Sequence, residues 1–183
     1  MRRTVSIKLD ISPDRHVALV LLQEAFNKAC NAIASIAREN RCWNRVALHH
    51  LCYYQIRLNQ TNEQARLGSQ MVCNAIKTVC DAYKVLKIKR AEAIPEIIFK
   101  QISSVHFDKR TYSLKGEKMS LYTLSGRMLI QMRLGEFQRS YLQRGLPKEA
   151  ELVYKNGQWF LNLVLDLPNV QALPAAGKVL GVD

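Results

Sequence analysis

A stretch of polar side chains near residue 70 has the residue types that read and neutralise nucleic acids. Gln70, Asn74 and Lys77 are separated by four and three residues, so they share one face if this stretch is helical. An asparagine or glutamine amide can pair with two atoms of adenine, and a lysine ammonium can neutralise a phosphate. The alternative is a solvated face of an amphipathic helix, which is the preferred interpretation for a helix whose surroundings are unknown.

Basic and aromatic residues are interleaved between residues 106 and 118, a second pattern suited to nucleic acid. The cations can neutralise phosphates and the rings can stack on splayed bases, a combination that fits folded RNA. The residues concerned are Phe107, Lys109, Arg110, Tyr112, Lys115 and Lys118, and Arg2, Arg3 and Lys8 are expected to extend the same surface. A β-hairpin with a solvated face would show the same pattern, and the sequence favours neither interpretation.

Candidate metal ligands are few. Asp183 ends the apolar run VLGVD, and a carboxylate at the end of a buried strand can hold a divalent cation. Two-metal hydrolysis of a phosphodiester needs several carboxylates, so Asp183 alone cannot perform it. His49 and His50 are adjacent but have no further ligands at a fitting spacing. The five cysteines include no CxxC pair, which predicts core packing instead of a zinc site.

The net charge of +12 points to a polyanionic partner, and nucleic acid is the first candidate. A generally basic surface would give the same charge, so charge by itself favours nucleic acid only modestly. No apolar run reaches the roughly 20 residues that a membrane span needs, and the start MRRTVSIKLD leads into a strand pattern instead of a signal peptide. We therefore expect a cytoplasmic protein with no membrane partner.

Hydrophobic periodicity predicts the elements that position these residues. Residues 3–9 alternate between apolar and polar, as a half-buried strand does. Ser12 and Pro13 have the types expected at the cap and the first position of a helix. The predicted helices run from Pro13 to about Arg38, from 44 to 58, with an apolar face of Ala47, Leu48, Leu51, Tyr54 and Leu58, and from about Leu67 to Arg90.

After Pro95 the chain changes to short segments with strand periodicity, separated by turn residues. Asn156 and Gly157 give the strongest hairpin signal. One strand, three helices and then several strands predict an α+β chain, in which a helical bundle is inserted into a β-barrel or sandwich. The predicted strands lie near 104–107, 111–115, 119–123, 127–132, 150–154 and 159–166, followed by a linker at 168–177 and a new strand at 178–183.

The order of these motifs resembles the N-terminal half of the TnpB (OrfB) family of transposon-encoded nucleases and of the compact type V CRISPR effectors related to them. Nearly the whole chain takes part in the resemblance, and the order of the segments carries more weight than any single motif. The segments are LLQEAFNKACN, SQMVCNAIKTVCDAYKVLK, FKQISSVHFDKRTYSLKGEKMSLYTLSGRMLIQM, NGQWFLNLVLDLP and the final VLGVD.

The resemblance implies an RNA-guided protein that binds and cleaves DNA, with a division into domains that follows the motifs. Asp183 would be the first catalytic acid of a RuvC nuclease and a ligand of Mg²⁺. This sequence lacks the family's other two acids, its bridging helix and its zinc-binding CxxC pairs, so cleavage would need a second chain. The implied domains are a wedge-type, OB-like β-barrel at 1–11 and 95–167, a helical recognition domain at 12–94, a linker at 168–177 and the first RuvC (RNase H-like) strand at 178–183.

The same resemblance implies two partners, a guide RNA and a double-stranded DNA target, in a prokaryotic, nucleoid-associated protein. The start of the helix near residue 70 would lie where the family recognises a short DNA motif beside its target. The residues expected to contact that DNA are Asn44, Arg45, His49, Ser69, Gln70, Cys73, Asn74 and Lys77. The alternative function is that of a non-enzymatic nucleic-acid-binding regulator or accessory protein derived from the same family.

Overall fold

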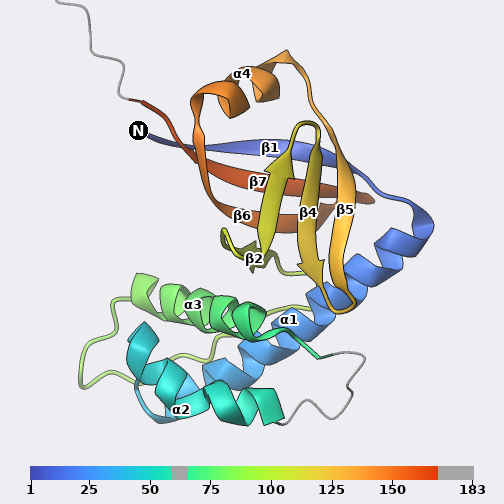
Figure 1. The fold of residues 1–183 in the computed structure, drawn as a ribbon. Helices are drawn as coiled ribbons and strands as arrows, with labels where there is room; N and C mark the ends of the chain where they lie inside the picture. Colours follow the sequence, from blue (N-terminus) through green and yellow to red (C-terminus); the bar gives the residue numbers. More distant parts are fainter. Residues whose placement is uncertain (59–65, 169–183) are drawn as a thin grey trace, which may run out of the picture.

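The computed structural model describes residues 1–58 and 66–168 (Figure 1). It is a mixed α/β structure, with three helices on one side of a curled antiparallel sheet and a fourth, short helix at the other end. The elements are β1 (Arg2–Asp10), α1 (Pro13–Glu39), α2 (Arg45–Leu58), α3 (Ser69–Val85), β2 (Val105–Phe107), β3 (Tyr112–Lys115), β4 (Lys118–Thr123), β5 (Gly126–Arg133), α4 (Glu136–Arg144), β6 (Leu146–Lys155) and β7 (Gln158–Asp166).

The sheet has seven strands in the order β2-β6-β7-β1-β5-β4-β3, which makes β1 a central strand. β1 pairs antiparallel with β7 and with β5, for example Val5 with Leu163 and Leu9 with Met132. This confirms the prediction that the first strand pairs with strands beyond residue 100. Because the edge strands β2 and β3 do not pair with each other in the described part of the chain, the curled sheet stays open as a half-barrel. The OB-like details and the domain boundaries stay predictions.

The alternating residues of the strands decide which face of the sheet forms the core. In β7, Trp159, Leu161, Leu163 and Leu165 are all buried, while the residues between them are half-buried. The predicted hairpin is confirmed, because Lys155 pairs with Gln158 across a two-residue loop. Asn156 and Gly157 both have positive φ angles, 51° and 73°, as the favoured two-residue hairpin turns require.

The helices α1, α2 and α3 pack together below the half-barrel (Figure 1). The side chains of Leu22, Phe26 and Ile33 on α1 are fully covered in this lobe, whereas Leu21 is 50% exposed. Cys30, Cys52 and Cys80 are buried in this lobe, as predicted for core cysteines, while Cys42 and Cys73 are half-buried. Burial raises the pKa of the Cys52 thiol to about 12, so this thiol stays protonated at neutral pH.

Two details of the predicted helices are wrong. Of the predicted face, α2 buries only Leu48, together with Cys52 and Ile56, and it leaves Tyr54 and Leu58 both 74% exposed. α3 ends at Val85 and does not reach Arg90. Val85 is 77% exposed, so burial does not stabilise another helical turn there. Lys87 has a left-handed φ of 49°, which ends the helical backbone. The short helix α4 was not predicted at all.

Three amide side chains on α1 tie the helical lobe to the chain segment that leads into β2. Gln23, Asn27 and Asn31 are four residues apart and lie along one side of the helix. The Asn31 amide group both donates to the Phe99 carbonyl oxygen (2.9 Å) and accepts from the Phe99 amide (2.7 Å). The amides of Gln23 and Asn27 donate to the Ser103 carbonyl oxygen. These hydrogen bonds hold the segment before β2 on α1, and β2 then lies against α3.

Candidate nucleic-acid interface

The start of α3 is joined to the half-barrel through the carboxylate of Asp108, which follows β2. The Gln70 amide donates to Asp108 Oδ2 at 2.7 Å, and Arg110 Nε donates to the same oxygen at 3.2 Å. The Thr111 hydroxyl lies 3.0 Å from Asp108 Oδ1. Partial burial acts to raise the pKa of the Asp108 carboxyl, but the hydrogen bonds from Thr111 and Arg110 outweigh it and lower the pKa.

Asn74, one turn further along α3, lies inside this junction. It has no exposed surface, and its amide donates to the His106 carbonyl oxygen (3.3 Å) and to the Thr111 hydroxyl (3.2 Å). A base edge cannot reach an amide that is fully covered and already bonded. The expectation of an accessible Asn74 is therefore wrong for this conformation, and base reading by Asn74 would need the junction to open.

Lys77 continues the same face and is also paired. Its ammonium lies 2.8 Å from Asp81 and 3.3 Å from Glu149 of β6. Burial acts to lower the pKa of Lys77, but the two carboxylates outweigh it and raise the pKa, so the ammonium stays charged. Nearby His106 is 7% exposed, and its Nε2 has no hydrogen-bond partner among the described residues. Burial and the charge of Lys77 lower the pKa of His106.

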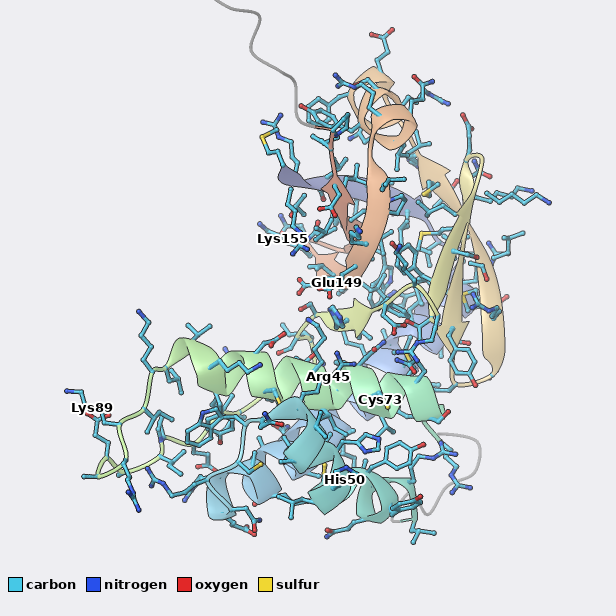
Figure 2. All side chains as sticks on the ribbon, turned by 60° about the vertical axis from the view of Figure 1, so that its left-hand side comes forward. Arg45, His50, Cys73, Lys89, Glu149 and Lys155 are labelled. Carbon is cyan, nitrogen blue, oxygen red and sulfur yellow. The ribbon has the colours of Figure 1, made fainter. Side chains whose placement is uncertain are left out.

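Beside this face, α3 meets α2 in an open hollow of about 250 Å³. Three predicted DNA contacts line it together, Arg45 and His49 from α2 and Cys73 from α3. Figure 2 shows Arg45 and Cys73 toward the α2 side of α3 and Glu149 on its barrel side. Burial raises the pKa of the Cys73 thiol despite the opposing charges of Arg45 and Arg110, so Cys73 is not an activated nucleophile.

The remaining predicted DNA contacts lie at helix starts. Asn44 caps α2, because its Oδ1 accepts hydrogen bonds from the amides of Val46 (3.0 Å) and Ala47 (3.1 Å). Ser69 is exposed at the first turn of α3. Before it, Gly68 packs so closely on Tyr122 of β4 that an added Cβ would lie 2.5 Å from the ring. The start of α3 is thereby fixed against the half-barrel.

On the half-barrel, a second hollow of about 340 Å³ collects basic residues from three segments. Arg2, Lys109 and Arg110, all predicted RNA contacts, line it together with Lys148 of β6. Arg2 and Lys148 share one carboxylate, Asp166, at 3.1 Å each. Lys109 is exposed and forms no ion pair within the described part of the chain. The carboxylates of Asp108 and Glu149 also line this hollow.

The other predicted RNA contacts do not join this hollow. Phe107 is fully buried and Tyr112 is 3% exposed, since β2 is covered by α3 and the first residue of β3 points into the core. Neither ring offers a face to a base, so the expectation of stacking by these two rings is wrong for this structure. Arg3 lies beside α4, Lys8 is half-buried on β1, and Lys115 and Lys118 are exposed at the β3–β4 turn.

Lys148 was missed by the sequence analysis, because nothing local distinguishes a lysine beside Pro147. Its position is set by the register of β6 with β7, which brings it to Asp166. Within residues 1–58 and 66–168, no group of three or more His, Cys, Asp or Glu side chains is arranged to hold a metal ion. Asp183 and the predicted strand at 178–183 lie outside the described residues. No helix in the described ranges is long and apolar enough to cross a membrane.

Comparison with known proteins gives a structural match only. A scan against models of protein families and a search of curated proteins both find no match. A chain in a cryo-EM structure of a CRISPR-Cas12f ternary complex matches with a TM-score of 0.50 and 9% sequence identity. The match covers 83% of this chain and 42% of the Cas12f chain, so this chain spans less than half of that protein. At this identity the likeness shows a shared fold, of the Cas12f kind.

Proposed function

We propose that this chain is the nucleic-acid-binding part of a compact RNA-guided nuclease of the type V kind. Its half-barrel binds the guide RNA, and its helical lobe binds the DNA beside the target. The net charge of +12 and a fold like that of a chain in a Cas12f ternary complex support this proposal. In such a protein, guide pairing reads the target while the protein reads only a short flanking motif.

The observation that carries the proposal is the grouping of candidate residues into two separate hollows. Arg45, His49 and Cys73 share the hollow between α2 and α3, while Arg2, Lys109 and Arg110 share the one on the half-barrel. The hollow on the half-barrel brings together cations that are far apart in the sequence, and the hollow between α2 and α3 places the Arg45 cation of α2 beside Cys73 of α3. Phosphate contacts of this kind position a nucleic acid without reading its sequence.

Sequence reading belongs to the start of α3 in this proposal. Ser69 is exposed there, and Gln70 is half-buried with its amide on Asp108. Asn74 and Lys77 become available to DNA only when their bonds to the half-barrel open. Cleavage belongs to a RuvC domain that begins near residue 178, with Asp183 as one Mg²⁺ ligand. Its other acids come from polypeptide outside residues 1–183, because a second copy of these residues would lack them too.

The proposal is tested with the 183-residue chain, a structured RNA hairpin and a DNA duplex, followed by fluorescence anisotropy over a range of salt. Phosphate neutralisation predicts that both affinities fall as salt rises. Lys109→Gln should lower the slope of affinity against salt for RNA by about one unit, while Arg45→Gln should do so for DNA. Lys28→Gln, at an exposed lysine on α1, is the matched control and should change neither slope.

Equal effects of Lys109→Gln, Arg45→Gln and Lys28→Gln on both ligands would contradict the proposal of two separate surfaces. Binding that does not depend on salt would contradict the electrostatic basis. With Mg²⁺ present, the chain alone should leave DNA uncut, because one candidate carboxylate cannot hold two metal ions. Efficient cutting by the chain alone would contradict the assignment of catalysis to further chain.

A further inference from the structure

Helix α4 carries a cluster of aromatic and basic side chains that neither hollow includes. α4 lies on top of the half-barrel next to β1, away from the helical lobe (Figure 1). It contains no buried residue, although Phe137 is a large apolar side chain and is 57% exposed. A nine-residue helix is marginal by itself in water, and the half-buried Tyr141 and Leu142 pack α4 against the core, which leaves Phe137 exposed.

Two arginines are held against one ring on this helix. The guanidinium groups of Arg3 and Arg144 lie 5.2 Å and 5.1 Å from the centroid of the Tyr141 ring. Arg3 also donates to the Tyr141 hydroxyl, and Arg144 Nε donates to the Ser140 carbonyl oxygen at 3.0 Å. The Phe137 ring lies 4.7 Å from that of Tyr141, tilted by 55°. Rings and cations therefore form one connected surface.

The charge of this surface is not balanced. Arg139 pairs with Glu117, and Arg2 shares Asp166 with Lys148. Glu136 lies in the first turn of α4, where a carboxylate favours the helix. Within the described part of the chain neither Arg3 nor Arg144 pairs with a carboxylate, which leaves two ordered positive charges beside an exposed ring. A polyanion complements this surface, and a free ring beside it favours one with unstacked bases.

We propose that α4 and Arg3 form a binding platform for an unpaired RNA strand, with a base stacked on Phe137 and phosphates on Arg3 and Arg144. A double-stranded RNA offers phosphates but no free base face, so Phe137 contributes only to single-strand binding. This inference rests on the proposed function, because it names the part of an RNA that this side of the half-barrel binds. It assigns α4 a role that the sequence patterns did not suggest.

The test compares an oligouridine of about 12 nucleotides with an RNA duplex of about the same length, a size that suits one barrel. Phe137→Ala should weaken oligouridine binding by on the order of tenfold and leave duplex binding within about twofold. Phe137→Tyr, which keeps the ring, should restore the affinity. Leu129→Ala, at a residue 50% exposed on β5, is the matched control and should change neither affinity. Thermal unfolding verifies that each variant is folded.

A second measurement locates the contact directly. An oligouridine with 4-thiouridine should crosslink to the tryptic peptide Leu134–Arg139, which holds Phe137. Equal loss of oligouridine and duplex binding in Phe137→Ala, or no loss in either, would overturn the platform, as would crosslinks confined to other peptides. RNA binding that depends on Lys109 but not on Phe137 would overturn the platform and leave the proposed function standing. Failure to bind any RNA would contradict both.

Discussion

The candidate DNA-contacting residues on the two sides of α3 lie in different environments. On the barrel side, Gln70, Asn74 and Lys77 are bonded to Asp108, Thr111 and Glu149, and Asn74 is completely covered. On the α2 side, Arg45, His49 and Cys73 surround an open hollow. The barrel side thus holds two parts of the molecule together, whereas the hollow on the α2 side is open. Helical spacing shows which residues share a face but not what that face meets.

The comparison makes the clearest prediction at Asn74. Asn74→Ala should lower the free energy of unfolding by about 3 kcal/mol, because the His106 carbonyl and the Thr111 hydroxyl lose a buried partner. Urea unfolding measures this change. Ser69→Ala, exposed on the same helix, should cost less than about 0.5 kcal/mol. A similar small cost for Asn74→Ala would mean that the α3–barrel junction is already open in solution.

Gly68 tests how tightly the start of α3 is held. Gly68→Ala places a Cβ 2.5 Å from Tyr122, so the ring or the helix must shift, at a cost of about 2 kcal/mol. In a Tyr122→Leu background the same change should cost much less, and this coupling is measured by a double-mutant cycle. Equal costs in both backgrounds would show that Tyr122 does not restrain the start of α3.

His106 predicts a pH dependence for the same junction. Its pKa is lowered by burial in the folded state, so the unfolded chain binds the proton more readily. Stability should therefore fall as the pH drops below the ordinary histidine value of about 6.5, by at most about 1.4 kcal/mol per pH unit. His106→Gln should flatten this dependence, and His50→Gln, at an exposed residue on α2, should not. Urea unfolding at several pH values measures the pH dependence of the free energy of unfolding for both variants and for the unchanged protein.

The smallest change in stability is expected on the open side. Arg45→Gln should alter the free energy of unfolding by less than about 0.5 kcal/mol and lower the salt slope of DNA binding by about one unit. Lys77→Gln removes pairs with Asp81 and Glu149, so its main effect should be on stability. If Lys77→Gln weakened DNA binding more than Arg45→Gln did, with both variants folded, the barrel side of α3 and not the α2 side would be the DNA-binding side. This result would also favour the original prediction that Lys77 anchors a phosphate.

Much of the fold was predictable because its signals are local. Alternation located the strands to within a few residues, and the Asn156–Gly157 pair identified the β6–β7 hairpin. Ser12 and Pro13 correctly marked the start of α1. The helix α4 was missed because it has only nine residues and none of them is buried. The end of α3 was overestimated because the apolar pattern continues to Ile88 although the packing stops earlier.

The sequence by itself determined the strands, the helix starts and the residues that share a face, since each depends on neighbours within a few positions. The tertiary structure alone decided which faces are covered. In the folded chain, Phe107, Tyr112 and Asn74 are buried. Lys148 reaches the hollow that Arg2 and Lys109 also line. These outcomes depend on how α3 packs against β2 and on the register of β6. Asn74 and His106 lie 32 residues apart. Lys148 and Asp166 lie 18 apart, beside a register shift in β6, so a pattern over a few neighbouring residues encodes neither contact.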